Sequence, residues 1–476
     1  MPLFLSLWGK HPKEAFSEGF FFGLTSFFGS LYWIYHSINH YGNLSFVTSI
    51  LLVLLLCCYL SLYPALFAYC YVAMIRKTKL PALVIAPFFW VVLEFVRSYA
   101  FTGFPWASIG YSQYLFLSVI QISDITGVYG ISFLILAVNG ACTDMFLLKK
   151  RIKEKPLFPL SYTIFGFLIL ICLLAGTIVY GVWSQGRERQ GSFITASIVQ
   201  GNIEQEFKWD SSYQNHVMNT YFTLSEEAAA FSPDIIVWPE TAVPFYFGSD
   251  IEQSAVLVDF QKNLHSYLLF GSVSMQDYQD DKMLLSNSAV LLDQKGKTIY
   301  TYDKIHLVPF GEYVPLRNIL FFIDKLVVGV GDYISGKTYQ TADTSIGRFG
   351  TLICYEIIFP GLARKFYTQG GDFMVTITND AWFGNTSGPY QHFGMAVFRA
   401  VENRKPMIRS ANTGISGFID SNGRILSQTE LFTRTTLTQT LKTDRTLTLY
   451  TRYGDLFAMF CLITTIIVTI NTRPWR

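Results

Sequence analysis

The sequence predicts an α/β domain placed between membrane-spanning helices. Three observations lead to this prediction. The 476-residue chain is 51% hydrophobic and only 15% charged, its longest apolar runs lie towards its two ends, and the region between them alternates strand-like and helix-like segments. A soluble protein is seldom so apolar. Long apolar runs indicate membrane helices, and the alternation predicts helices layered on sheets.

Charge and cysteine content narrow the class further. The chain has 36 basic and 34 acidic residues and a net charge of +2, so we expect no nucleic-acid partner. Six of the seven cysteines lie in apolar runs, where a cysteine is usually a small packing residue. Cys354 is the only cysteine of the central region. This excludes a disulfide framework there and makes Cys354 a candidate nucleophile.

Apolar runs of about 20 residues predict five membrane crossings before the soluble region and one after it. The runs are Ala15 to Ile38, Phe46 to Met74, Leu80 to Val96, Gly127 to Leu148, Leu157 to Trp183 and Leu456 to Ile470. We therefore expect membrane helices over residues 1–184, a soluble domain over 185–454, and a membrane helix with a cytoplasmic tail over 455–476.

Basic residues of the short loops predict the orientation. They gather on one side, which the positive-inside rule assigns to the cytoplasm: Lys10, Lys13, Arg76, Lys77, Lys79, Lys149, Lys150, Arg151, Lys153, Lys155, Arg473 and Arg476. The soluble domain is then extracytoplasmic. The Tyr99 to Thr126 loop, with its GFPW sequence, is expected at the outer interface. Glu94 and Arg97 nearby are expected to snorkel, although a functional contact is the alternative.

The soluble region is long enough for a core of its own. Short runs rich in branched and aromatic residues predict buried strands at Ile194 to Gln200, Asp234 to Trp238, Leu268 to Val273, Ser288 to Leu292, Gly350 to Cys354 and Phe373 to Thr378. Helices are predicted at Tyr213 to Phe231, Ile251 to Leu264, Phe359 to Thr368 and Gln391 to Glu402.

Three of the segments carry residues suited to acyl transfer. Glu240 closes the apolar strand DIIVW, so its carboxylate should emerge at a strand end, where it could take the proton of the Cys354 thiol and return it to a leaving group. Lys304 follows the strand-like YTYD, and a lysine near a thiol can stabilise an oxyanion. The backbone amide after Cys354 could join the oxyanion hole.

Each residue also has an ordinary interpretation. Glu240 could be a surface residue that opens a turn, Lys304 a solvated lysine, and Cys354 a packed strand residue. The presence of all three segments favours catalysis. Neither His306 nor His392 has a partner at metal-ligand spacing, so we expect no metal and no other cofactor.

Five sequence segments resemble bacterial apolipoprotein N-acyltransferases: WPE, DKIHLVPFGEYVP, ICYE, TNDAWFG and ANTG, together with GFPW in the membrane part. The resemblance covers nearly the whole chain. The soluble half is similar to the carbon-nitrogen hydrolase, or nitrilase, superfamily, which implies an αββα sandwich with a Glu-Lys-Cys triad.

By this resemblance, Glu240 is the general base, Lys304 the oxyanion stabiliser and Cys354 the nucleophile. A supporting or substrate-binding role is implied for Glu312, Tyr355, Glu356, Trp209, Asn379 and Trp382. The implied reaction is ping-pong. Cys354 takes a fatty acyl chain from a phospholipid, typically phosphatidylethanolamine, and the α-amino group of the diacylglyceryl-cysteine of an apolipoprotein then accepts it. The implied site is the bacterial inner membrane, and we expect a monomer.

The family usually has eight membrane helices, seven of them before the catalytic domain, so Met1 to Trp8 resemble the end of a further helix. Two other functions stay open from the residues alone. A membrane-tethered amidase would use water as the acceptor, and a scaffold would have no activity. A lipid substrate would favour mobile loops over the site, for which Pro244 to Asp250 and the apolar Leu316 to Tyr333 are candidates.

Overall fold

The computed structural model describes residues 1–78, 80–150, 160–279, 282–314, 332–368 and 370–471. The chain forms two compact units. The membrane unit comprises Met1–Tyr35, Ser45–Arg187 and Arg452–Arg476, and the catalytic unit comprises His36–Leu44 and Glu188–Thr451. The catalytic unit therefore includes a short segment that precedes the long helix α4 in sequence.

Helices are the regular secondary structure of the membrane unit in its described residues, and loops join them. Its longer helices are α2 (Pro12–Leu31), α4 (Phe46–Thr78), α5 (Ala82–Tyr99), α8 (Val128–Lys150), α9 (Leu160–Gly186) and α15 (Leu456–Asn471), and its shorter ones are α1 (Pro2–Ser6), η2 (Ile109–Gln113), α6 (Leu117–Ile120) and α7 (Ser123–Thr126). A short helix, α3 (Ile34–His36), lies at the boundary with the catalytic unit.

Within the described residues, α4, α5, α8 and α9 are long and apolar enough to cross a membrane. The first predicted crossing, Ala15 to Ile38, largely corresponds to α2, which is not one of these four, and α15 is a shorter apolar helix. The predicted crossing Leu157 to Trp183 begins at residues outside the described part. The predicted crossings thus include all four described helices that are both long enough and apolar enough to cross a membrane.

Glu94 and Arg97 lie inside the membrane unit, so the expected snorkelling is wrong. Their side chains are buried, and both bind the loop that follows α5. Arg97 donates to the carbonyl of Trp106 and to the hydroxyl of Ser108, each at 3.0 Å. One Glu94 oxygen accepts the amide of Ile109 at 2.8 Å. The two charges fix the GFPW loop because its polar backbone would otherwise be buried without partners.

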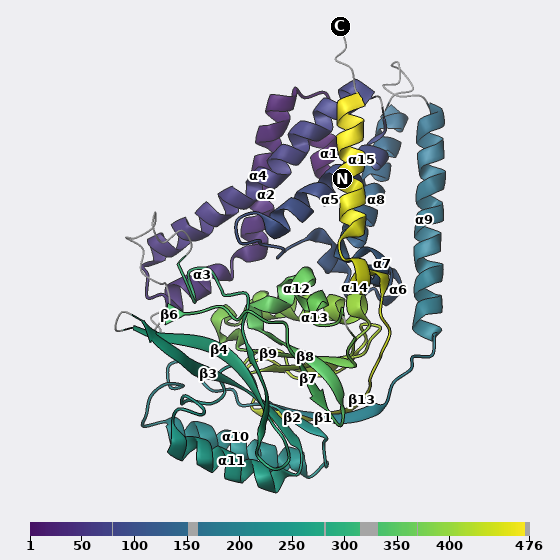
Figure 1. Ribbon diagram of the computed structural model, residues 1–476. Helices are drawn as coiled ribbons and strands as arrows, with labels where there is room; N and C mark the ends of the chain where they lie inside the picture. Colours follow the sequence, from purple (N-terminus) through teal and green to yellow (C-terminus); the bar gives the residue numbers. More distant parts are fainter. Residues whose placement is uncertain (79, 151–159, 280–281, 315–331, 369, 472–476) are drawn as a thin grey trace. The chain divides into compact units, whose positions relative to one another are not determined.

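The catalytic unit contains two sheets (Figure 1). The first has the order β13-β1-β2-β3-β4-β5, with β6 beside β4, and the second has the order β12-β11-β10-β9-β8-β7. The strands are β1 (Phe193–Gln200), β2 (Ile235–Val237), β3 (Tyr267–Gln279), β4 (Lys282–Leu292), β5 (Thr298–Asp303), β6 (Asp332–Tyr333), β7 (Thr341–Thr344), β8 (Gly347–Ile353), β9 (Phe373–Thr378), β10 (Met407–Ala411), β11 (Gly417–Ile419), β12 (Ile425–Gln428) and β13 (Thr435–Lys442).

Parallel strands occupy the centre of each sheet. In the first sheet β1, β2 and β3 are parallel, and in the second β8, β9 and β10 are parallel. Side chains from the two sheets meet, and the Ser410 hydroxyl of β10 donates to the Val237 carbonyl of β2 at 3.1 Å. The ends of these central strands carry three of the predicted site residues, Glu240, Cys354 and Asn379, as is usual in α/β folds.

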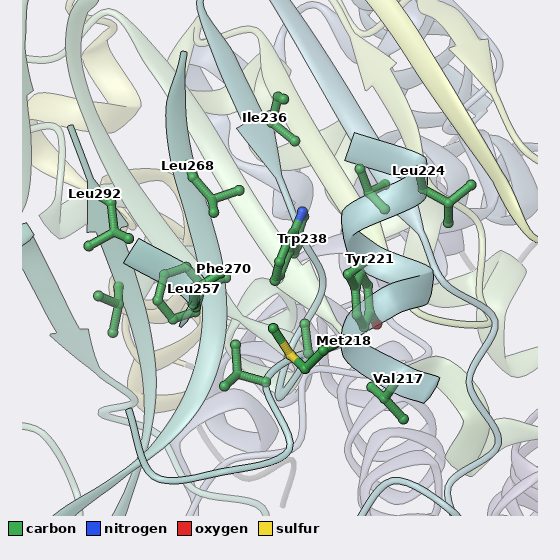
Figure 2. Close-up of a cluster of buried hydrophobic side chains, with 14 of the residues drawn as sticks. Val217, Met218, Tyr221, Leu224, Ile236, Trp238, Leu257, Leu268, Phe270 and Leu292 are labelled. Atoms are coloured by element: carbon green, nitrogen blue, oxygen red, sulfur yellow. The ribbon is translucent and has the colours of Figure 1, made fainter. Parts of the chain in front are cut away.

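Helices cover the outer faces of both sheets. On the first sheet lie α10 (Gln214–Ala229) and α11 (Ile251–Leu264), and on the second lie α12 (Pro360–Lys365) and α13 (Gly388–Asn403) (Figure 1). Figure 2 shows the core between α10, α11 and the first sheet, where Tyr221 stacks on Trp238. Burial of these apolar side chains stabilises this layer. The remaining helices are η1 (Ser37–Tyr41), η4 (Cys354–Ile358), η5 (Asp380–Phe383) and α14 (Leu449–Tyr453).

The predicted α/β sandwich is confirmed, with helices outside and two sheets inside. The predicted helix Ile251 to Leu264 and the predicted strand Phe373 to Thr378 have the bounds of α11 and β9. The predicted strand Gly350 to Cys354 instead ends at Ile353, because Cys354 turns out of the sheet.

Candidate active site

Glu240 lies just beyond β2, in a turn that packs closely on β3. The backbone of this turn pairs with Gly271, whose amide donates to the Pro239 carbonyl at 3.1 Å. A Cβ on Gly271 would come within 2.6 Å of the Glu240 Cα and 2.4 Å of the Thr241 nitrogen. Only glycine allows this approach. The apolar strand therefore delivers a buried carboxylate at its end, as predicted.

Lys304 follows β5 and points its ammonium group between two carboxylates. Its Nζ is 3.0 Å from Glu312 Oε1 and 3.6 Å from Glu240 Oε1. The Lys304 side chain is 1% exposed, so these charges interact with little screening by water. Burial opposes the charged form, but Glu312 and then Glu240 overcome it and raise the pKa of Lys304 above its ordinary value. Lys304 is thus a permanent cation.

Asn287, on β4, joins the same cluster and was missed from the sequence. Its Nδ2 donates to Glu240 Oε1 at 2.7 Å and to Glu312 Oε1 at 3.1 Å. The second oxygen of Glu312 accepts the amide of Val308 at 2.7 Å. The polar SNS sequence before the apolar AVLL run of this strand was the available signal. The side chains of Glu240, Asn287, Lys304 and Glu312 are called the charged cluster below.

Cys354 begins the short helix η4 directly after β8. Its φ of +52° lies in the left-handed region, which a residue with a Cβ seldom adopts. Such strain is typical of functional sites and persists only where the surroundings impose it. The cysteine is buried, and the Thr378 hydroxyl acts to lower the pKa of its thiol.

The thiol interacts electrostatically with the charged cluster. Burial and then the Glu240 charge raise the pKa of the Cys354 thiol, while Lys304 acts in the opposite direction. The net effect keeps the sulfur protonated at neutral pH. The nearby lysine therefore does not by itself produce a thiolate, and a base has to remove the proton when the thiol reacts.

Glu356 supports the site through hydrogen bonds to the segments that carry Lys304 and Cys354. It is fully buried, and its Oε1 accepts the hydroxyl of Tyr302 at 2.8 Å and the amide of Ile305 at 2.7 Å. Its Oε2 accepts the amide of Ile353 at 2.8 Å. These bonds tie the residues on both sides of Lys304 to the end of β8, directly before Cys354. Burial raises the pKa of Glu356 to about 7.

The other four predicted site residues fall into two groups. Asn379 contacts the charged cluster, because its backbone amide donates to Glu240 Oε2 at 2.8 Å. Tyr355, Trp209 and Trp382 lie around it. The Tyr355 ring contacts the rings of His306 and Phe359. The half-exposed Trp209 faces Tyr246, with 6.0 Å between the ring centroids, and Trp382 faces Tyr41, with 4.6 Å between the ring centroids.

Lys208 is a second buried lysine that was missed. Its Nζ donates to the backbone carbonyl of Glu240 at 2.9 Å and to the hydroxyl of Thr241 at 2.6 Å. It therefore ties the loop that carries the neighbouring Trp209 to the Glu240 turn. Burial lowers the pKa of Lys208 to about 7, although the Glu240 charge opposes this shift. Its position beside the predicted Trp209 in EFKW was the available signal.

The segment His36–Leu44 packs on the TNDAWFG turn. The Ser37 hydroxyl donates to the Trp382 carbonyl at 2.6 Å, and the Tyr41 hydroxyl donates to the Ala381 carbonyl at 3.2 Å. His40 lies 3.8 Å from Glu206, in the loop that also carries Lys208. Residues distant in sequence thus complete the surroundings of the site.

Two loops were predicted to be mobile. Of Pro244 to Asp250, Pro244 and Phe245 are buried, and only Gly248 and Ser249 are exposed. Most of Leu316 to Tyr333 lies outside the described residues. Two surface hollows of about 310 and 400 Å³, both lined by Arg348, include none of the predicted site residues. Among the described residues no cluster of three His, Cys, Asp or Glu could hold a metal ion.

Known proteins are similar to both parts of the chain. A model of the family described as carbon-nitrogen hydrolase matches residues 195–449, and one described as apolipoprotein N-acyltransferase N-terminal domain matches residues 1–141. The crystal structure of a carbon-nitrogen hydrolase from Helicobacter pylori G27 is 15% identical with a TM-score of 0.42, over 52% of this chain and 89% of that chain.

The sandwich, with its buried Glu, Lys and Cys at strand ends, defines an enzyme of the carbon-nitrogen hydrolase class, here joined to membrane helices. Apolipoprotein N-acyltransferase from Geobacter metallireducens is 42% identical, over 97% of this chain and 87% of the relative. The one from Pasteurella multocida is 34% identical, over 93% and 84%. The chain belongs to the apolipoprotein N-acyltransferase family.

Proposed function

We propose that this protein transfers a fatty acyl chain from a phospholipid, through a thioester on Cys354, to the α-amino group of the N-terminal diacylglyceryl-cysteine of an apolipoprotein. One observation carries the chemistry: the buried Cys354 thiol interacts electrostatically with Glu240 and Lys304, and the Lys304 ammonium contacts both Glu240 and Glu312. Membership of the apolipoprotein N-acyltransferase family favours this function over an amidase or an inactive scaffold.

In the first half-reaction, Glu240 removes the thiol proton as the sulfur attacks the ester carbonyl of the phospholipid. The carbonyl oxygen becomes an oxyanion, which Lys304 and the amide of Tyr355 stabilise. Collapse of this intermediate breaks the ester C–O bond, and Glu240 returns the proton to the departing oxygen. A lysophospholipid leaves, and the acyl chain remains on Cys354 as a thioester.

In the second half-reaction, the neutral α-amine of the apolipoprotein attacks the thioester carbonyl. Glu240 takes a proton from the amine, the C–S bond breaks, and the sulfur recovers a proton. Glu312 and Asn287 keep Lys304 and Glu240 in place through both steps. Asn287 donates to Glu240 and to Glu312, and Glu312 accepts a hydrogen bond from Lys304. Both substrates are anchored in lipid, so the reaction suits a domain attached to membrane helices.

The basic loops support a position in the bacterial inner membrane with the catalytic unit on the extracytoplasmic side. Phosphatidylethanolamine is the proposed acyl donor, and Trp209 and Trp382 are proposed to contact the substrates from the rim of the site. The protein is proposed to act as a monomer without a cofactor.

The test is intact-mass analysis of the purified protein after incubation with phosphatidylethanolamine alone. We expect a hydroxylamine-labile acyl adduct on wild type and on Cys142→Ala, which lacks an exposed cysteine of the membrane unit, and none on Cys354→Ala. Addition of a diacylglyceryl peptide should then remove the adduct and acylate the peptide. An adduct on folded Cys354→Ala, or none on folded wild type, would overturn the proposal.

A further inference from the structure

His392 lies on α13, next to the backbone of Cys354, and has no part in the proposed reaction steps. It is fully buried. Its Nε2 is 3.2 Å from the backbone carbonyl oxygen of Cys354. On the other side of the ring, Nδ1 is 3.1 Å from Asp380 Oδ1 and 2.9 Å from Arg409 Nη2. The ring thus connects a buried ion pair to the backbone of the cysteine.

The contact with Cys354 fixes which nitrogen carries hydrogen. A carbonyl oxygen only accepts hydrogen bonds, so Nε2 must be the donor. Burial and then the Arg409 charge lower the pKa of His392, which keeps the ring neutral at neutral pH. In a neutral ring with hydrogen on Nε2, Nδ1 is an acceptor, and it can accept from the Arg409 guanidinium.

Arg409 holds the ring in this orientation by donating to Nδ1, and Asp380 holds Arg409. Arg409 Nη2 also donates to Asp380 Oδ2 at 2.9 Å, and Arg409 Nε donates to the carbonyl of Ile415. Burial acts to raise the pKa of Asp380, but the Arg409 charge lowers it below its ordinary value, so the carboxylate is ionised. Its Oδ1 accepts the hydroxyl of Thr378 at 2.8 Å, the same hydroxyl that acts to lower the pKa of the Cys354 thiol.

The bonded carbonyl belongs to the peptide unit between Cys354 and Tyr355. In a planar trans peptide, the carbonyl and the following amide N–H point in opposite directions. Fixing the Cys354 carbonyl against α13 therefore fixes the direction of the Tyr355 N–H. This N–H is the backbone donor that the proposed mechanism requires at the oxyanion. The φ of +52° at Cys354 makes such a restraint necessary, because this conformation is intrinsically unfavourable.

We propose that His392 is a positioning residue, oriented by Arg409, which Asp380 holds in place, and that it aims the Tyr355 amide at the oxyanion by holding the Cys354 carbonyl. The inference rests on the proposed function for its catalytic meaning. It concerns only the formation of the tetrahedral intermediate. It predicts that reactions of Cys354 that form an oxyanion need His392, whereas reactions that form none do not.

The test compares His392→Gln with His392→Asn. The glutamine Nε2 can reach the position of the histidine Nε2 and donate to the same carbonyl, whereas the asparagine amide reaches only as far as Nδ1. Two reagents modify Cys354 without any phospholipid. A p-nitrophenyl ester acylates the thiol through an oxyanion, and iodoacetamide alkylates it by displacement without one. The exposed His216→Gln is the matched control, and Cys354→Ala corrects for the other cysteines.

We expect His392→Asn to slow acylation by the ester about 100-fold, the usual effect of losing one oxyanion donor, and to leave alkylation within about twofold. His392→Gln should regain most of the acylation rate, and His216→Gln should match wild type. Equal slowing of both reactions in His392→Asn would show a displaced cysteine and overturn the inference, as would equal acylation rates in the two variants. Failure of the lipid function alone would appear as ester acylation without acylation by phosphatidylethanolamine.

Discussion

The two sheets of the catalytic unit contribute to the site in different ways. From the first sheet come the side chains of the charged cluster, which bind one another directly. From the second sheet and α13 come Cys354 and the Asp380, His392 and Arg409 network, which reaches the nucleophile mainly through its backbone. The first sheet thus supplies charge and proton transfer, and the second supplies geometry. Substitutions in the two should therefore fail in different ways.

Glu240→Gln should give the largest loss. The amide cannot accept the thiol proton, and the thiol is protonated at neutral pH. We expect acyl-enzyme formation to fall by about 10³- to 10⁴-fold, at the upper end of general-base contributions. The rate is measured by quenched-flow mass spectrometry with phosphatidylethanolamine. The exposed Glu252→Gln should leave it unchanged. A loss below tenfold would mean that another group is the base.

Lys304→Met should be next in size and should also destabilise the protein. Without the ammonium, Glu240 and Glu312 face each other in a buried site, and the oxyanion loses a cation. We expect acylation to fall by about 10²- to 10³-fold and the unfolding free energy by about 3 kcal/mol. Both are compared with Lys262→Met, whose lysine is half exposed. An unchanged melting temperature would contradict the buried contacts of Lys304.

Asn287→Leu tests whether the charged cluster needs an uncharged member. The substitution removes donors from both carboxylates without adding charge, and each lost bond should cost about 1–3 kcal/mol. We expect acylation to fall by about tenfold or somewhat more. Alkylation of Cys354 by iodoacetamide should slow as well, because the loss of Asn287 shifts Glu240, and Glu240 is the base that removes the thiol proton. Asn263→Leu, on the exposed face of α11, is the control. Slower ester acylation with unchanged alkylation would instead mean that Asn287 acts by stabilising the oxyanion.

The same division explains what the sequence could predict. Glu240 and Cys354 each follow a buried apolar strand, and Lys304 follows the half-exposed strand β5, so a polar or reactive residue at a strand end stands out from its neighbours. The parallel strands β1, β2 and β3 and the parallel strands β8, β9 and β10 deliver Glu240 and Cys354, whereas Lys304 comes from the end of β5, which is antiparallel to β4. The alternation of strands and helices was sufficient for the α/β class, because buried strands and amphipathic helices differ in the spacing of their apolar residues.

The supporting residues could not be predicted because their partners are distant in sequence. His392 showed no metal-ligand spacing, and its contacts with Cys354 and Asp380 exist only after α13 packs on the second sheet. Arg409 interrupts the apolar strand β10, which indicates a buried charge but not its partner. Glu94 and Arg97 illustrate the same point in the membrane unit. Their charges suggested an interface, whereas the folded loop supplies their partners.

Lys208→Met should have the smallest effect on the reaction and a distinctive effect on stability. Its pKa is about 7 in the folded protein and 10.5 in the unfolded chain, so the unfolded chain binds more protons between these values. Stability must then rise with pH over this interval. We expect the apparent melting temperature of wild type to gain several degrees relative to Lys208→Met between about pH 7 and about pH 9. The exposed Lys295→Met should behave as wild type.

The activity of Lys208→Met shows whether the first sheet also depends on a backbone restraint. Lys208 holds the Glu240 carbonyl much as His392 holds that of Cys354. If this tether only orders the loop, acylation should fall by less than about tenfold and ester acylation and alkylation should change together. A larger loss confined to ester acylation would show that the geometry of the oxyanion site depends on both sheets, and the separation of charge from geometry would then be wrong.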